Sequence, residues 1–291
     1  MMRAYRQRGV ALLLVMWLIM LLAALVGAFA LLARTEHLQG RVLVRGLVAE
    51  NAARAGLEYA MTRVGATDPR LQWLPDGRPH RWRYVNADVE VKVVDENGKI
   101  DLNQADMTLL TEFIRRFDVE QQRAAQLAAA IVDWRDPDSL TQPAGGGEDS
   151  DYASAGLPYG AKDAEFESVA ELEQVLGFTP ELYARMAPHL TVFSGRTRPD
   201  PAFASAEVLD AMGMDGAEVV AVRQRWNPAS GLPPPTLPDG SALVGGSSGT
   251  YSIESRARLA DRREAVLRAV VRAGGSMPGM AYTPLRWQVG D

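Results

Sequence analysis

A continuous apolar segment near the amino terminus places the strongest constraint on how this chain can fold. Residues 10–33 contain no charged side chain, and as a helix rising about 1.5 Å per residue they would span roughly 36 Å, enough to cross a bilayer. The apolar part of a cleaved secretory signal is shorter, about 7 to 15 residues, so this segment is expected to remain as a membrane anchor. Arg3, Arg6 and Arg8 precede it without any acid, which predicts a cytoplasmic amino terminus and a periplasmic body.

The apolar pattern continues beyond this segment at helical spacing, through Leu47, Leu57 and Met61 among others. No proline occurs between Met1 and Thr67, and proline is the residue that most strongly breaks a helix. The sequence therefore predicts one long helix from about Val10 to Val64.

Alternation of apolar and polar residues replaces the helical pattern after Pro69 and predicts an antiparallel sheet. We expect one half-buried strand running from Trp82 to Val93, followed by a hairpin turn at Asn97-Gly98, a strong turn signal. Three further strands are expected near the carboxyl end: Tyr251–Ala257, Ala265–Val271 and Tyr282–Val289.

Helical periodicity fills the middle of the chain, which predicts an α-helical domain inserted into the sheet. Three segments each carry a capping residue, apolar residues at helical spacing and a turn; they begin at Ala105, Ser168 and Ser205. The segments resemble helix-hairpin-helix (SAM-like) units, which in other proteins contact the DNA backbone. The later turns lack basic residues, and binding to DNA needs Lys or Arg to neutralise phosphates, so a packing role is favoured and no nucleic-acid partner is expected.

An acidic loop follows the first of these segments. Between Asp133 and Glu173 there are eleven acidic residues against only Arg135 and Lys162, and residues 145–147 are all glycine. Hard cations such as calcium take six to eight oxygen ligands, largely from carboxylates and carbonyls. The loop does not match the EF-hand pattern, so composition alone leaves open whether it binds calcium or is a solvated acidic surface.

Other chemistries have little support in the sequence. The chain contains no cysteine, which excludes disulfides, thiolate zinc sites and a cysteine nucleophile. His37, His80 and His189 are far apart and form no metal-spaced pair. No nucleophile motif lies near His189, and no aromatic cluster flanks the acidic loop as a sugar site would require. We therefore predict a protein that is not an enzyme.

The residues that precede the apolar segment carry the most specific signal. A short basic leader ends at Gly9, and the apolar run starts at Val10. An ordinary signal anchor has no need of this glycine, whereas the arrangement resembles a prepilin-type signal. In that family a prepilin peptidase cuts after the glycine and methylates the new terminal amine, which implies cleavage between Gly9 and Val10 and N-methylation of Val10. The family usually has Glu at the fifth mature position, where this chain has Leu14.

Together these features resemble the K-type minor pseudopilin family of the type II secretion system, in which that Glu is absent. The resemblance also rests on segments 97–103, 133–136, 171–177 and 251–258. It implies an α+β fold: a pilin-like long N-terminal helix packed on an antiparallel sheet, with a large inserted helical domain. The implied divisions are a leader at 1–9, a transmembrane part at 10–33, a periplasmic helix at 34–66, a head at 67–102 and 250–291, a helical domain at 103–226 and a Pro/Gly-rich loop at 227–249.

The resemblance further implies structural calcium in the acidic loop. The implied ligands are Asp136, Asp138, Glu148 and Asp151, with Asp133 and Asp149 as further candidates. The implied partners are minor pseudopilins I, J and H, the major pseudopilin, prepilin peptidase, the inner-membrane platform, and the secretin or an exported protein. The implied role is to initiate or cap the pseudopilus tip from a single-pass inner-membrane anchor. Two alternatives remain: a minor pilin of a type IV or competence pilus, and a membrane-anchored helix-hairpin-helix DNA-binding protein.

Overall fold

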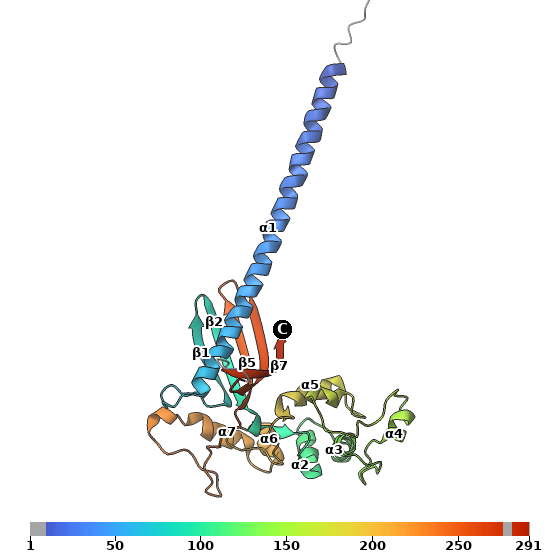
Figure 1. Ribbon diagram of the computed structural model, residues 1–291, viewed down its shortest axis with the longest axis vertical. Coiled ribbons are helices and arrows are strands. Elements are labelled where there is room, and N and C mark those ends of the chain that lie inside the picture. The colour runs from blue at the N-terminus through green and yellow to red at the C-terminus, as the bar shows by residue number, and fades with distance from the viewer. Residues whose placement is uncertain (1–9, 276–280, 291) are drawn as a thin grey trace, which may run out of the picture.

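The structure, a computed structural model, describes residues 10–275 and 281–290. Helix α1 (Val10–Val64) is a single unbroken helix, as the sequence predicted. Its first part, Ala11–Leu32, is long and apolar enough to cross a membrane, and none of it is buried against the described chain. Figure 1 shows this part extending away from the rest of the molecule. The predicted leader, including Gly9, lies outside the described residues.

The second half of α1 packs against a five-stranded antiparallel sheet. The strand order is β1-β2-β5-β6-β7, and the strands are β1 (Asp76–Tyr84), β2 (Ala87–Asp95), β5 (Thr250–Leu259), β6 (Glu264–Ala273) and β7 (Tyr282–Val289). The helix can approach closely because its contact face is built from small residues: Ala49, Ala52, Ala53 and Ala60 are all buried. A Cβ at Gly56 would lie 2.2 Å from Ser255 Oγ and 2.8 Å from Val89 Cγ1, so a larger residue there would force helix and sheet apart.

The sequence prediction of one strand across Trp82–Val93 is wrong, because the structure forms a hairpin there. Strands β1 and β2 pair from Asp76↔Val94 to Tyr84↔Ala87 and are joined by Val85 and Asn86. Val85 has φ of 52°, a conformation that β-branched residues seldom adopt. The turn was missed because neither Gly nor Pro marks it.

The predicted hairpin turn at Asn97-Gly98 is also wrong. These residues belong to a short 3-10 helix, η1 (Glu96–Gly98), which leads into β3 (Ile100–Asp101). Strand β3 pairs in parallel with β4 (Leu190–Thr191). Gly98 is required by close packing, since a Cβ there would lie 2.5 Å from the carbonyl carbon of Phe203.

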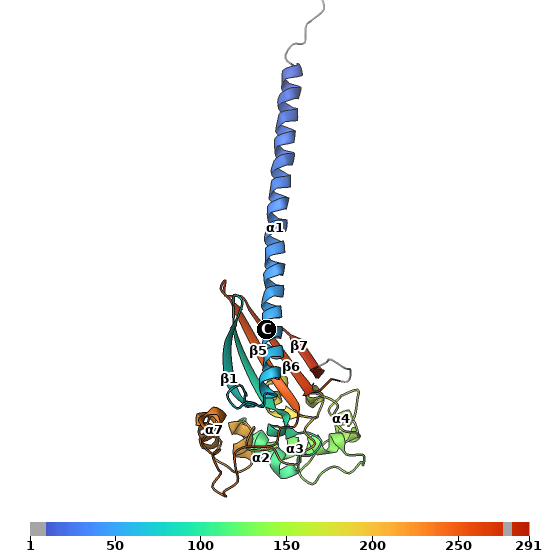
Figure 2. The same ribbon diagram turned by 60° about the vertical axis from the view of Figure 1, so that its left-hand side comes forward.

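The helical part lies between β2 and β5 along the chain, and these two strands are neighbours in the sheet. Its elements are α2 (Met107–Arg115), α3 (Gln121–Arg135), α4 (Asp149–Ser154), η2 (Val169–Glu173), α5 (Pro180–Met186), η3 (Ala187–His189), α6 (Ala206–Ala211) and α7 (Gly216–Arg225). It has its own buried core, separate from the core between α1 and the sheet. Figures 1 and 2 place it at the end of the head remote from the apolar segment of α1.

Each of the three predicted hairpin units turns at a residue with positive φ. These residues are Asp118 (64°) between α2 and α3, Gly177 (87°) between η2 and α5, and Gly213 (83°) between α6 and α7. The second unit opens with a 3-10 helix in place of an α-helix. Two of the three turns thus use glycine, which reaches positive φ without strain, and the first uses aspartate.

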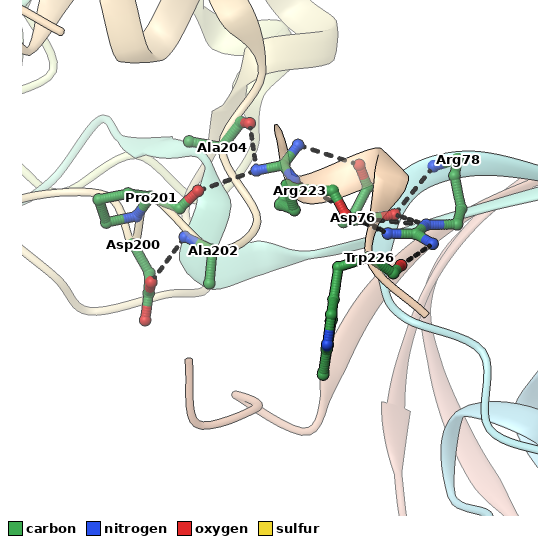
Figure 3. A network of polar contacts seen from close by, with 8 residues as sticks. All are labelled: Asp76, Arg78, Asp200, Pro201, Ala202, Ala204, Arg223 and Trp226. Carbon is green, nitrogen blue, oxygen red and sulfur yellow. Dashed lines mark hydrogen bonds and ion pairs between the residues drawn. The ribbon is translucent and has the colours of Figure 1, made fainter. Parts of the chain in front are cut away.

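A buried arginine joins the helical part to the sheet (Figure 3). Arg223 on α7 is only 2 % exposed and donates to the carbonyls of Pro201 (2.8 Å) and Ala204 (2.9 Å). Its Nη2 also donates to the carbonyl of Asp76 on β1, at 3.3 Å. Asp76 is paired in turn with Arg78 at 2.7 Å. This network holds α7 against the start of β1.

The Pro-rich segment after α7 packs more closely on the rest of the protein than its composition suggests. It contains the short 3-10 helix η4 (Pro228–Ser230) and one isolated bridge, Thr236↔Ala242. Leu237 and Leu243 are buried in the helical core, so this segment is packed on the helices.

Candidate metal centre

The candidate site begins at the carboxyl end of α3. The helix is capped by Glu120, whose side chain accepts from Arg123 N, and ends at Arg135, because Asp136 is already extended. Asp133, in the last turn, is fully buried and accepts the backbone N–H groups of Gly147 (2.8 Å) and Gln142 (3.3 Å). The chain after α3 therefore folds back over the end of the helix.

Glycine makes this close return possible. A Cβ at Gly146 would lie 1.8 Å from Asp133 Oδ2, which no side chain could occupy. Gly147 then leads into Glu148, the N-terminal cap of α4. The loop thus carries Glu148 back to the end of α3.

Three carboxylates meet at this point. Asp133, Asp136 and Glu148 can place one oxygen each within 4.8 Å of one another. Glu148 is 6 % exposed, and neither its Oε1 nor Asp136 Oδ1 has a hydrogen-bond partner among the described residues, although both atoms are buried. Buried carboxylate oxygens without a donor are costly, and a bound cation would remove that cost.

The raised pKa values of these three carboxylates also indicate that positive charge would stabilise the site. Burial, followed by the negative charges of Asp133 and Asp136, raises the pKa of Glu148 to about 7. Burial also raises the pKa of Asp133 and of Asp136 above their ordinary values, with neighbouring carboxylates adding to the effect. In Asp133 the two backbone N–H donors oppose this rise.

The other candidate ligands lie outside this triad. Asp138 is exposed and accepts from Leu140 N at 2.8 Å. Asp151 accepts from Glu148 N at 3.0 Å within a capping box. Asp149 is exposed at the start of α4. Asp133, one of the two further candidates from the sequence, takes the more central place.

Sequence reasoning missed Asp163. Its charge contributes to the raised pKa of both Asp136 and Glu148, and its φ is 53°. It comes from the loop between α4 and η2, outside the Asp133–Asp151 segment in which ligands were sought. The only available signal was its membership of the longer acidic run.

This oxygen-only arrangement fits a hard divalent cation. Three carboxylates from two segments would supply the charge, and waters or backbone carbonyls could complete a shell of six to eight oxygens. The residues that meet here include neither histidine nor cysteine, the ligands that structural zinc sites mostly use.

A second polar cluster lies at His189, close to α6. Its Nδ1 is 2.8 Å from Ser205 Oγ and 3.8 Å from Glu207 Oε2. Burial lowers the pKa of His189. A catalytic relay needs the hydroxyl and the carboxylate on opposite ring nitrogens, whereas both groups approach the same nitrogen here. The arrangement is that of a histidine packed in the helical core.

Of the candidate residues at the predicted leader and membrane segment, Val10 and Leu14 lie within the described part of the chain and Gly9 does not. Helix α1 begins at Val10, and Leu14 is 65 % exposed on the apolar segment. Position 14 is therefore not covered by the head.

Comparison with known proteins identifies relatives. Residues 89–195 match the family model described as type II secretion system (T2SS), protein K. The type II secretion system protein K of Klebsiella pneumoniae is 27 % identical over 217 residues, which is 66 % of this chain and 65 % of the relative. That of Aeromonas hydrophila is 28 % identical over 177 residues, 55 % of this chain and 54 % of the relative. The matched part thus spans less than two thirds of either protein.

A third relative and a solved structure extend the similarity. The protein K of Pectobacterium carotovorum subsp. carotovorum is 25 % identical over 251 residues, 76 % of each chain. A chain in the crystal structure of the GspK-GspI-GspJ complex from the enterotoxigenic Escherichia coli type 2 secretion system matches with a TM-score of 0.56 and 18 % identity. The match covers 89 % of this chain and 99 % of that one, and shows a shared fold.

Proposed function

We propose that this chain, whose resemblance to the type II secretion system protein K family is confirmed by these comparisons, is a minor pseudopilin at the tip of the pseudopilus. The observation that carries the proposal is the division of α1. Its first part is apolar and unburied, and its second part packs on the sheet of the head. Such a helix can leave the membrane and join a helical bundle while the head keeps its own core.

Two features support a place at the tip. The helical part covers the end of the head remote from the anchor (Figure 2), where the head of another subunit further along the fibre would have to pack. Leu14 stands where pilins usually carry a Glu that neutralises the amine of a neighbouring subunit. A subunit without a neighbour beyond it has no amine to neutralise, and a carboxylate in hydrocarbon costs about 2.5 to 3.5 kcal/mol.

The proposed assembly has defined partners. The related structure holds GspK together with GspI and GspJ, so we propose that this chain assembles with minor pseudopilins I and J. Minor pseudopilin H and the major pseudopilin would lie further down the fibre. Prepilin peptidase would cleave after Gly9 and methylate Val10, and the inner-membrane platform would extract the subunit. At the tip the head would face the secretin or an exported protein in the periplasm.

We propose that the acidic site holds calcium in a structural role. Asp133, Asp136 and Glu148 are the principal ligands, and Asp138 and Asp151 are close along the chain. Calcium supplies charge neutralisation, which lets the loop between α3 and α4 close on the helix end. The two buried oxygens without partners support this role.

Replacing Leu47 on α1 with glutamate is expected to weaken assembly. Val44, Leu47 and Val48 are 60 %, 58 % and 48 % exposed just beyond the membrane segment, which makes an apolar stripe suited to another helix. With this chain expressed alongside its I and J partners, Leu47→Glu should reduce the amount of I and J that copurifies by about tenfold.

Leu232→Glu provides the matched control, because it makes the same change at a leucine that is 68 % exposed, away from α1. Equal recovery of I and J with both variants would contradict the assignment of this stripe as the assembly surface. Failure of the unaltered chain to copurify with I and J would contradict the proposed function.

A further inference from the structure

A groove on the helical part has features of a binding site distinct from the metal centre. It has a volume of about 630 Å³ and lies between α7, the α6–α7 turn and the Pro-rich segment. This volume falls in the range of about 300 to 1,000 Å³ that is common for ligand sites. The groove lies outside residues 89–195, which match the family model, and near α7 at the end of the head remote from the anchor (Figure 1).

The floor of the groove is apolar and well packed. Val219 on α7 and Leu237 and Leu243 on the Pro-rich segment are 8 %, 9 % and 4 % exposed. Met214 and Val222 are half-buried beside them and line the walls. An apolar side chain entering here would find apolar contacts on both sides.

The wall opposite α7 is already ordered. Leu237 N donates to Ser241 O at 2.8 Å, Gly240 N donates to Leu237 O at 2.9 Å, and Leu243 N donates to Pro235 O at 2.8 Å. These bonds fold the segment into a tight turn that holds its own shape. Binding would therefore cost little ordering of the protein.

The rim of the groove is acidic. Asp215, Glu218 and Asp239 line it and are exposed, and none of these carboxylates forms an ion pair within residues 10–275 or 281–290. Hydrogen bonds from the Ser241 hydroxyl and backbone N–H lower the pKa of Asp239, so this group stays ionised at neutral pH. The groove thus combines an apolar floor with three negative charges and no lining cation.

We propose that this groove binds a short segment of another protein in which a large apolar side chain is flanked by lysine or arginine. The apolar side chain packs on Val219, Leu237 and Leu243. The basic side chains lie over the carboxylates of the rim, where exposed opposite charges steer association and set the choice of partner. An acidic or phosphate-bearing ligand is repelled by the same rim.

The test uses the full chain in detergent and two fluorescently labelled synthetic peptides. Both peptides carry one Phe and two Leu in a Ser/Gly background; one has lysines beside them and the other has glutamates at the same positions. The lysine peptide is expected to bind with an affinity about tenfold or more above that of the glutamate peptide. Reversing the rim with Glu218→Lys and Asp239→Lys together should invert this preference.

Glu173→Lys is the matched control, because Glu173 is exposed on η2 and does not line the groove; it should leave the preference unchanged. A Val219→Ala variant should weaken both peptides and so report on the apolar floor. Equal binding of both peptides, a preference that the reversed rim does not change, or no binding of either peptide would overturn the proposal. So would a self-associated chain that the reversed rim converts to monomer, because the groove would then hold a second copy.

Discussion

Calcium is expected to raise the melting temperature of the metal-free protein by about 5 to 10 °C when present about a hundredfold above its dissociation constant. Binding at that ratio adds about 2.7 kcal/mol to the free energy of unfolding, and each kcal/mol moves the midpoint by about 2 to 4 °C in a domain of this size. The physical reason is the meeting of Asp133, Asp136 and Glu148 with two buried oxygens left without donors. Differential scanning calorimetry with calcium or a chelator measures the shift.

Glu148→Gln separates this account from a general effect of salt. The substitution keeps the shape of the side chain and removes a buried charge, so the metal-free variant should melt above the metal-free wild type while losing the response to calcium. Glu173→Gln, at an exposed position outside the site, should respond as the wild type does. A calcium response in Glu148→Gln equal to that of the wild type would show that the ion binds elsewhere.

The pH dependence follows from the raised pKa of Glu148. Without a cation, burial and the neighbouring carboxylates hold this pKa at about 7, above its value in the unfolded chain. The native state then binds more protons than the unfolded state between about pH 4.5 and 7, so the free energy of unfolding falls as pH rises through this window. Calcium competes with the proton, and its affinity should therefore rise over the same window; titration by calorimetry at several pH values measures this.

Arg223→Ala is expected to lower the free energy of unfolding by about 2 to 6 kcal/mol, because two carbonyl acceptors lose their donor at about 1 to 3 kcal/mol each. The loss leaves the carbonyls of Pro201 and Ala204 without a donor and Asp76 with Arg78 alone (Figure 3). Denaturant unfolding in detergent, followed by tryptophan fluorescence, measures the change because Trp226 lies one residue beyond α7.

Arg225→Ala is the control on the same helix. Arg225 is exposed, and surface substitutions usually change stability by less than about 0.5 kcal/mol. If Arg223→Ala cost no more than this control, the junction between α7 and β1 would owe its stability to other contacts.

The sequence predicted the structure best where its pattern of apolar residues fits only one kind of secondary structure. A proline-free helical pattern predicted α1 from Val10 to Val64, and alternation of apolar and polar residues predicted the last three strands. The sequence prediction failed at Val85-Asn86, where a β-branched residue takes positive φ. It also failed at Gly98, where glycine is needed because a Cβ would clash with the backbone of Phe203, a residue distant in the sequence.

The sequence predicted a candidate site made of acidic residues, but it was less accurate about which of these side chains lie close together. Asp136 and Glu148 meet, but Asp138 and Asp151 are engaged by backbone N–H groups, and Asp133 takes a central place. The difference arises because Gly146 lets the loop close directly on Asp133. The charge of Asp163 acts on the same carboxylates from a later loop, and local spacing carries no information on such a long-range effect.

The intact mass and N-terminal peptide of the protein from its native membrane test the pseudopilin account most directly. Cells with and without prepilin peptidase should be compared. The account predicts a chain that starts at N-methylated Val10 only when the peptidase is present. A chain that keeps residues 1–9 in both, or is cut within the apolar segment, would contradict it, since either product could not enter a pseudopilus through its terminal helix.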